Sequence, residues 1–294
     1  MSLIKFIQTK AHSLLAKLGF KRKYTIAGVQ IEMSFFHLRP EYEKNHPLYD
    51  KFLPNLVKVL PEDTLIVEVG ANVGYALIEM ARANSSLKFV AIEADHRTFE
   101  DLQKNVASLR KIEPNVSVTI VKEFIGLAID NVSLEPYSGS NHAVLDGGAI
   151  KSKPLVETFS ELDLDSEKLS LLITDADGFD WDVIQSAYKL FEQNPYIYFE
   201  CFYTNLDQLE NFNNLFYELQ VKGYSDFAFF DNYGQYICTT SDLSQIKDML
   251  DYIAFQNFSN SSRTMYYYDV LAFPKNKSAE VKELIYDFNQ QFSR

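Results

Sequence analysis

The sequence predicts an α/β protein in which a mainly parallel β-sheet is covered by helices on both faces. From about residue 61 onward, short apolar runs of strand length alternate with segments whose apolar residues recur at every third or fourth position. The chain has 294 residues, of which 47% are hydrophobic, so it can bury a large core. Strands that alternate with helices are typical of a parallel sheet, because helices form the connections between its strands.

Seven apolar runs are the predicted strands: residues 65–69, 89–92, 116–121, 171–173, 196–199, 227–230 and 269–273. Five segments between them are predicted helices. They are residues 75–83 and the apolar stripes of Phe99, Leu102, Val106 and Leu109; of Val183, Ile184, Ala187, Tyr188 and Phe191; of Leu209, Phe212, Phe216 and Leu219, which Gly223 terminates; and of Leu243, Ile246, Leu250 and Ile253. In an open sheet of this kind ligands bind beyond the carboxyl ends of the strands. The residues directly after the strands are therefore the first candidates for a site.

The N-terminal residues differ from the rest of the chain. The first 23 residues include Lys5, Lys10, Lys17, Lys21, Arg22 and Lys23 without one acidic residue, and apolar residues recur among them at helical spacing. We predict a basic amphipathic helix here, within an extension of residues 1–60 that also contains a strand and a helix and precedes a main domain of residues 61–294. This helix either packs on its own domain or makes a weak contact with an anionic membrane surface.

Composition excludes some classes of partner. A net charge of -12 would repel the phosphate backbone of a nucleic acid. Cys201 and Cys238 stand apart and match neither a disulfide framework nor a pair of metal ligands, which favours a reducing compartment. No run approaches the roughly 20 apolar residues that a membrane span requires. We therefore expect a soluble, cytoplasmic protein, peripheral to the membrane if residues 1–23 bind it.

The strongest local signal is the segment Glu68-Val69-Gly70-Ala71-Asn72-Val73-Gly74-Tyr75, which joins a predicted strand to a helix. Gly70 and Gly74 frame a sharp turn where the lack of a Cβ lets a ligand approach the backbone closely. Asn72 and Tyr75 stand where a Gly-x-Gly-x-x-Gly dinucleotide motif has its second and third glycines, and the Gly-Lys-Ser/Thr ending of a phosphate-binding loop is missing. The turn therefore favours a nucleoside ligand without a pyrophosphate.

Glu93 supports this interpretation from the end of the next strand. It follows the turn by about 20 residues, where nucleotide-binding α/β proteins place the acid that binds ribose hydroxyls. Taken alone, the glycine turn could serve only tight helix packing. Taken alone, Glu93 could be an ordinary acid in contact with solvent at the end of a strand. The two features together, within one strand-helix-strand pattern, favour a nucleoside site.

Three motifs resemble those of the FkbM family of class I S-adenosylmethionine-dependent methyltransferases. The segment from Glu68 to Gly74 looks like the family's first motif, and Ile92-Glu93-Ala94-Asp95 resembles the end of its second strand. Thr174-Asp175-Ala176-Asp177-Gly178-Phe179-Asp180 is similar to its Ile-Asp-Val-Glu-Gly-x-Glu segment. The resemblance covers roughly residues 60–205. It implies a Rossmann-like methyltransferase fold with a seven-stranded sheet in residues 61–294.

The resemblance also implies S-adenosylmethionine as the cofactor. The cofactor-binding residues expected on this basis are Glu68, Gly70, Ala71, Asn72, Gly74, Tyr75, Glu93 and Ala94. Within this set, Glu93 is expected to bind the ribose.

Four aspartates crowd residues 175–182. Asp180 and Asp182 lie where a helix begins, and the helix dipole accounts for them without a further function. Asp175 and Asp177 directly follow a strand, so we predict that they contact the cofactor or the acceptor and are candidates for a catalytic base. The chain has Asp177 and Asp180 where the family usually has Glu, which shortens the reach of both carboxylates. We predict no bound metal at this loop.

Two further residues are candidates on weaker grounds. His142, in the polar segment of residues 138–142, is the third candidate base, and the alternative is an ordinary loop histidine. Glu200 follows another strand and either binds the substrate or caps neighbouring backbone amides.

The function that the resemblance implies is O-methylation of a hydroxyl on a small molecule, sugar or glycan, as in polysaccharide biosynthesis. The first alternative is a non-catalytic module that binds S-adenosylmethionine or another nucleoside. The second is an NAD-dependent oxidoreductase, which Asn72 and Tyr75 argue against. The sequence does not identify the acceptor or the oligomeric state.

Overall fold

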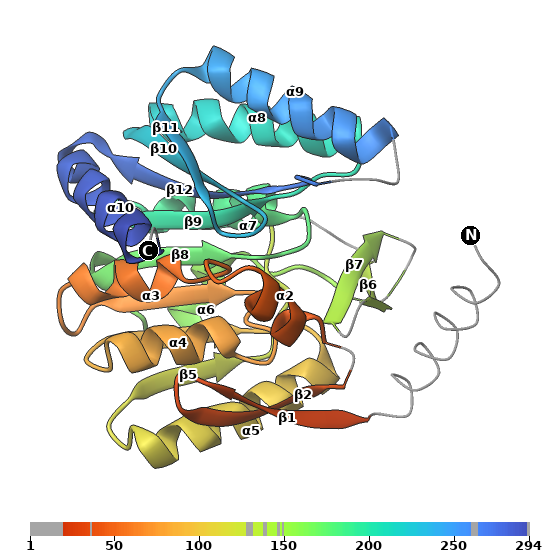
Figure 1. Cartoon of the computed structure of the whole chain (residues 1–294), viewed down its shortest axis with the longest axis vertical. Coiled ribbons are helices and arrows are strands. Elements are labelled where there is room, and N and C mark those ends of the chain that lie inside the picture. Colours follow the sequence, from red (N-terminus) through yellow and green to blue (C-terminus); the bar gives the residue numbers. More distant parts are fainter. Residues whose placement is uncertain are drawn as a thin grey trace.

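An eight-stranded sheet forms the centre of the computed structural model, which describes residues 20–35, 37–127, 132–137, 140–145, 148, 150–259 and 264–292 (Figure 1). The strands, in spatial order, are β11 (Tyr236–Thr240), β10 (Tyr224–Asp231), β12 (Tyr268–Pro274), β9 (Tyr196–Cys201), β8 (Leu169–Thr174), β3 (Leu65–Val69), β4 (Lys88–Ile92) and β5 (Ser117–Val121). All seven predicted strands are confirmed. The eighth, β11, is an additional strand at the sheet edge.

Strand direction divides the sheet into two parts. The five strands from β9 to β5 run parallel, whereas β12 is antiparallel to both of its neighbours and β11 is antiparallel to β10. The chain passes from β3 outward to β4 and β5, then returns to β8 and continues outward to β9 on the other side. The strand order therefore reverses between β3 and β8, which is where sheets of this kind open a crevice for a ligand.

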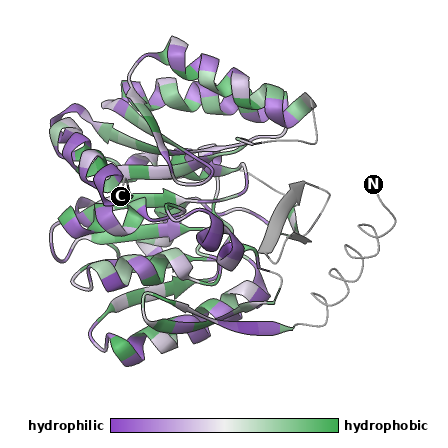
Figure 2. Ribbon diagram, viewed as in Figure 1, coloured by the Kyte–Doolittle hydropathy of each residue, from purple (hydrophilic) through white to green (hydrophobic). Residues whose placement is uncertain are grey.

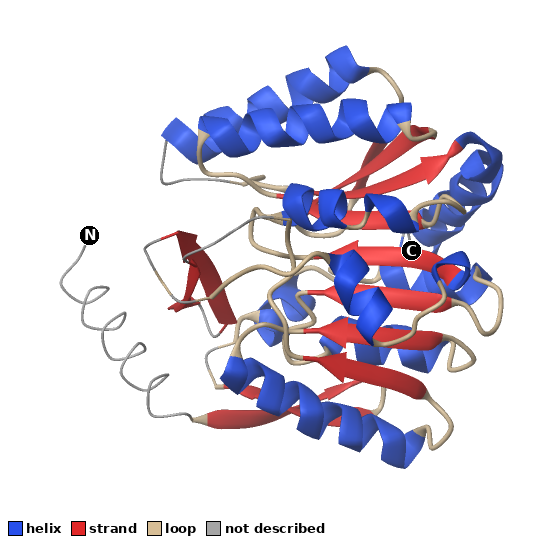
Figure 3. Ribbon diagram, turned by 180° about the vertical axis from the view of Figure 1, so that it is seen from behind, coloured by secondary structure: helices blue, strands red, loops and turns tan. Residues whose placement is uncertain are grey.

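Helices cover both faces of the sheet, as predicted (Figures 1 and 3). One face carries α3 (Phe52–Leu56), α4 (Tyr75–Ala83), α5 (His96–Ile112) and α10 (Ser278–Phe292), and the other carries α6 (Leu155–Glu161), α7 (Asp180–Ser186), α8 (Leu206–Val221) and α9 (Leu243–Ser259). Because side chains alternate along a strand, Ile66 packs into one core and Val67 into the other. Figure 2 shows the result as apolar central strands beneath helices with one polar side.

One predicted helix is shorter than expected. The stripe from Val183 to Phe191 indicated a single helix, but α7 ends at Ser186 and a 3₁₀ turn, η3 (Tyr188–Leu190), follows it. The backbone N–H of Ala187 donates to the carbonyl of Ile184 at 3.0 Å, and that of Leu190 donates to Ala187 at 2.8 Å. These hydrogen bonds join residues three apart, as in a 3₁₀ helix, and so wind the chain more tightly than an α-helix does. The apolar residues of the stripe still pack into the core.

The N-terminal extension contains a hairpin of β1 (Lys21–Ile26) and β2 (Val29–Ser34), followed by α2 (Arg39–Asn45). The prediction of a helix through residue 23 is wrong for Lys21, Arg22 and Lys23, which lie in β1. These polar residues suit an exposed strand, and Lys21 forms an ion pair with Asp101 on α5. Residues 1–19 of the predicted helix lie outside the described residues, so both interpretations of its role stay predictions.

A second hairpin, β6 (Val132–Tyr137) and β7 (Ser140–Leu145), stands apart from the central sheet (Figure 1). Residues 140–142 of the predicted polar loop belong to β7, so the loop prediction is wrong there. His142 lies opposite Glu135 in the hairpin register, although its side chain is outside the described part of the chain. Polar residues can form a β-hairpin because the hydrogen bonds between its strands are made by backbone groups. No helix among the described residues is both long and apolar enough to cross a bilayer.

Candidate functional site

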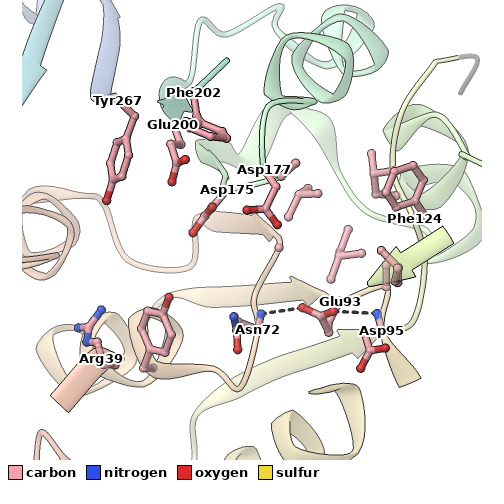
Figure 4. Close-up of a pocket in the computed structure, with 18 of the residues that line it drawn as sticks. Arg39, Asn72, Glu93, Asp95, Phe124, Asp175, Asp177, Glu200, Phe202 and Tyr267 are labelled. Atoms are coloured by element: carbon pink, nitrogen blue, oxygen red, sulfur yellow. Dashed lines mark hydrogen bonds between the residues drawn. The ribbon is translucent and has the colours of Figure 1, made fainter. Parts of the chain in front are cut away.

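A cavity of about 480 Å³ opens at the carboxyl ends of the parallel strands, where the strand order reverses. Its lining includes residues from each of the five segments that follow β3, β4, β5, β8 and β9, which are the segments that the sequence singled out. Two groups of residues face each other across it (Figure 4). We call Gly70, Asn72, Glu93 and Asp95 the turn side, and Asp175, Asp177, Glu200, Phe202 and Tyr267 the acidic side.

The turn side depends on left-handed backbone conformations. Gly70 and Gly74 both have φ of 86°, and Asn72 has φ of 51°. A Cβ on Gly70 would collide with the backbone carbonyl of Asp175, which shows how closely the ends of β3 and β8 approach each other. Glycine is therefore required at position 70 for two independent reasons, its dihedral angle and the lack of space.

Glu93 connects the turn to the end of β4 (Figure 4). Its Oε2 accepts a hydrogen bond from the backbone N–H of Asn72 at 2.8 Å, and its Oε1 accepts one from Asp95 at 2.8 Å. Burial raises the pKa of Glu93 to about 7, although the two backbone donors oppose this shift. The backbone thus fixes the carboxyl group at the cavity, and further lone pairs of its oxygens remain for the hydroxyls of a ligand.

The structure places the predicted cofactor-binding residues in two layers. Gly70, Asn72, Tyr75, Glu93 and Ala94 line the cavity. The other three, Glu68, Ala71 and Gly74, lie behind this lining. Ala71 is buried, and a Cβ on Gly74 would lie 2.7 Å from Cδ1 of Leu102, so these two small residues allow α4 and α5 to pack closely.

Glu68 is an unusual buried acid. Only 6% of its surface is exposed, and within the described part of the chain its Oε2 has no hydrogen-bond partner. Burial, followed by the negative charges of Asp50 and Glu93, raises the pKa of Glu68 to about 8. A buried carboxyl with an unused acceptor oxygen is unfavourable for the fold, and its burial favours the protonated form.

The acidic side is assembled from adjacent strand ends. Thr174 and Phe199 pair in register on β8 and β9, so Asp175 and Glu200 follow next to each other at the sheet edge. Their carboxyl groups lie within hydrogen-bonding reach of each other, and the environment raises the pKa of both well above the ordinary range, first through desolvation at the cavity and then through neighbouring acids. Asp175 is open to the cavity, and Asp177 lines it next to Asp175 with a left-handed φ of 50°.

Asp180 and Asp182 lie outside the cavity lining and hold the loop together. Asp180 accepts hydrogen bonds from Oγ1 of Thr174 at 2.9 Å and from the backbone N–H groups of Ala176 and Gly178 at 3.2 and 3.3 Å. Asp182 accepts one from the backbone N–H of Leu127 at 2.7 Å. These bonds fix the backbone from which Asp175 and Asp177 reach the cavity.

Sequence reasoning missed the N-terminal residues that close the cavity. Arg39 at the start of α2 is 1% exposed, and its guanidinium lies 4.2 Å from the ring centroid of Tyr75 and 5.0 Å from that of Tyr49. Its ion-pair partners are Asp50, Glu43 at 3.1 Å and Glu79 at 3.2 Å. The spacing of Arg39 and Glu43 on one helix was the only local signal, and such pairs are common on surfaces.

Other lining residues are aromatic, and the sequence favours a core position for residues of this kind. Phe124, Phe202, Tyr266 and Tyr267 line the cavity, and each stands just after or just before a strand. Aromatic residues near strands are more often core, and Phe229 and Phe230 on β10 are indeed buried there. Among the described residues, no group of three or more His, Cys, Asp or Glu side chains is arranged to hold a metal ion.

Comparison with known proteins adds three findings. The model of the methyltransferase FkbM domain matches residues 68–259. No protein of curated function matches the chain in sequence.

Similar solved structures include a methyltransferase FkbM from Methylobacillus flagellatus, at 13% identity over 81% of this chain and 52% of that chain with a TM-score of 0.41. An O-methyltransferase from Bacillus cereus in complex with SAH has 16% identity over 81% and 88% of the two chains and a TM-score of 0.44. TYW2 from M. jannaschii in complex with AdoMet has 9% identity over 86% and 84% and a TM-score of 0.42.

Proposed function

The chain belongs to the FkbM methyltransferase family, and from this premise we propose that it transfers the methyl group of S-adenosylmethionine to a hydroxyl of a sugar, glycan or other small molecule. One observation carries the proposal. A nucleoside-type turn with its acid, Glu93, faces the carboxyl groups of Asp175 and Glu200 across a single cavity. A donor on the turn side and an acceptor on the acidic side would then meet between the two.

On the turn side, we assign the ribose of the cofactor to Glu93 and the close approach of the nucleoside to Gly70 and Asn72. Glu68, Ala71, Gly74, Tyr75 and Ala94 complete the proposed cofactor site. S-adenosylmethionine itself supplies the electrophilic methyl group.

On the acidic side, Asp175 is the proposed base, with Asp177 as the second candidate. S-adenosylmethionine held on the turn side would supply the methyl group, which would pass from its sulfur to the acceptor oxygen with S-adenosylhomocysteine as the leaving group. The proton of the acceptor hydroxyl passes to Asp175. Alignment of the oxygen, carbon and sulfur in line is the main requirement, and such positioning supplies several kcal/mol of the barrier, up to roughly 7 to 11 in ideal cases.

The composition of the acidic side favours an uncharged acceptor rich in hydroxyl groups. Carboxylates accept hydrogen bonds from hydroxyls, and the rings of Phe202 and Tyr267 offer apolar faces for a sugar ring. Among the described lining residues, Arg39 is the one Lys or Arg side chain, and three carboxylates already surround it. An anionic acceptor such as a sugar phosphate would find no free cation here.

Binding and transfer measured with the same protein test this proposal. Calorimetry is expected to give tighter binding for S-adenosylmethionine than for NAD, and the reverse order would favour an oxidoreductase. Labelled methyl groups are then followed from the cofactor into extracted glycans and a panel of neutral sugars. Cofactor binding without transfer to any hydroxyl would support the non-catalytic alternative instead.

A further inference from the structure

We propose that Glu200 is a positioning residue, which keeps its proton and donates a hydrogen bond to Asp175 so that the Asp175 carboxylate is held facing the acceptor. The catalytic part of this inference rests on the proposed function, since it assumes that Asp175 accepts the hydroxyl proton. The sharing of one proton by the two carboxyl groups does not depend on that assumption.

The backbone fixes both residues before their side chains meet. The N–H of Asp175 donates to the carbonyl of Val69 at 3.0 Å, and the carbonyl of Asp175 lies against Gly70. Glu200 is held between two strands, because it follows Phe199 beside β8 and pairs with Asp269 on β12. The remaining freedom of Asp175 is rotation of its short side chain, and a hydrogen bond with Glu200, whose carboxyl group lies within reach, would restrict that rotation.

The surroundings of the pair are acidic on every side. Four aspartates face it: Asp177 and Asp180 from the β8–α7 loop, Asp50 from the segment before α3, and Asp269 from β12. The other titratable groups around it are Cys201 and the phenols of Tyr49, Tyr75, Tyr198, Tyr266 and Tyr267. Arg39 is the one Lys or Arg among the described lining residues, and Asp50, Glu43 and Glu79 already pair with it.

Two negative charges on the pair are therefore unfavourable, and one proton stays with it. The environment raises the pKa of both groups. Asp175 is exposed at the cavity and Glu200 is the more buried of the two, so the charge is expected on Asp175 and the proton on Glu200. A hydrogen bond from a carboxylic acid to a carboxylate is short and strong, so it holds the acceptor group firmly while the second Asp175 oxygen stays available to the cavity.

Two substitutions separate positioning from a merely structural role. Glu200→Gln keeps a hydrogen-bond donor but cannot ionise, whereas Glu200→Ala removes the contact. We expect Glu200→Ala to lower kcat about 100-fold, because a small misplacement of a catalytic group costs about that much, with little change in the affinity for S-adenosylmethionine. We expect Glu200→Gln to restore kcat to within about tenfold of the wild type and to remove any loss of activity at alkaline pH that comes from ionisation of Glu200.

The proton itself can be observed without cofactor or acceptor. In protein labelled with ¹³C at the carboxyl groups of Asp and Glu, the Asp175→Asn and Glu200→Gln variants assign the two signals. We expect the wild-type pair to keep one proton at pH values where ordinary carboxyl groups are fully ionised, and the Glu200 signal to be that of the protonated form. Ionisation of both groups below about pH 5, the ordinary range for carboxyl groups, would overturn the proposal.

The two experiments also distinguish failure of this inference from failure of the proposed function. A pair that shares a proton in a protein that methylates no hydroxyl would sink the proposed function alone. Methyl transfer at wild-type rate by Glu200→Ala would remove the positioning role and leave the proposed function standing.

Discussion

The two sides of the cavity are built by different means. On the turn side, backbone groups fix the acidic side chain, since both oxygens of Glu93 accept hydrogen bonds from backbone N–H groups a few residues away or across one strand. On the acidic side, side chains meet one another, since Asp175 and Glu200 stand next to each other where β8 and β9 end. In the proposed function, backbone hydrogen bonds would give a constant cofactor a rigid site, whereas side-chain contacts could be changed residue by residue to suit an acceptor.

The largest expected effect is a loss of kcat from a substitution on the acidic side that leaves the turn side unchanged. Asp175→Asn keeps the size of the side chain but removes the proposed base, so we expect kcat to fall by a factor of about 10² to 10⁴. Calorimetric affinity for S-adenosylmethionine is expected to change by less than about threefold, because a positioned base acts in the transition state and not in cofactor binding. Asp207→Asn, the same change at an exposed site on α8, is the matched control. Loss of transfer in Asp177→Asn and not in Asp175→Asn would assign the base to Asp177.

The next largest effect is a loss of stability from a substitution that strains the backbone of the turn side. Gly70→Ala forces both an unfavourable φ and a collision with the carbonyl of Asp175, so we expect the free energy of unfolding to fall by about 3 kcal/mol or more. Gly28→Ala is a close control, since Gly28 has φ of 81° and nothing within 4 Å of the added Cβ. Strain alone is expected to cost it about 1 kcal/mol. Equal losses in denaturant titrations of the two variants would show that the close approach of β3 and β8 contributes nothing.

The difference between the two sides also explains which features can be predicted from the sequence and which cannot. The apolar stripe of Leu102, Val106 and Leu109 predicts α5 because its spacing is a property of neighbouring residues, and the glycine turn is read in the same way. Arg39, Glu200 and Tyr267 come to line one cavity only after the sheet has formed, so no local pattern indicates that they share it.

The errors at the edges of the fold have the same origin. Lys21 to Lys23 look like part of a helix face, but pairing with β2 and the contact of Lys21 with Asp101 favour a strand. The edge strand β11 is half exposed and carries two threonines, so it lacks the apolar run that marks the central strands. In both places long-range pairing decides the structure, and single-sequence patterns do not contain that information.

A smaller effect tests the layer behind the turn side. The unfolded pKa of Glu68 is about 4.3, and the folded value is about 8, so between these values the folded state binds more protons and stability falls as pH rises. Glu68→Gln removes this titration. We expect the variant without cofactor to gain up to about 2 kcal/mol relative to the wild type between pH 6 and pH 8, measured by denaturant unfolding. A pH profile of stability equal to that of the wild type would contradict the buried titration.

The smallest effect is the pH dependence of cofactor affinity through Glu93. Burial raises the pKa of this carboxyl to about 7, and hydroxyls of a ribose donate best to its ionised form. Affinity for S-adenosylmethionine is therefore expected to rise about tenfold from pH 6 to pH 8, since about nine in ten Glu93 groups are protonated one unit below the pKa and must lose that proton on binding. Measured in the Glu68→Gln background, where the neighbouring titration is removed, the rise belongs to Glu93, and a further Glu93→Gln substitution should flatten it. An affinity that stays constant with pH would mean that Glu93 is already ionised at pH 6, and that the backbone donors of Asn72 and Asp95 outweigh its burial.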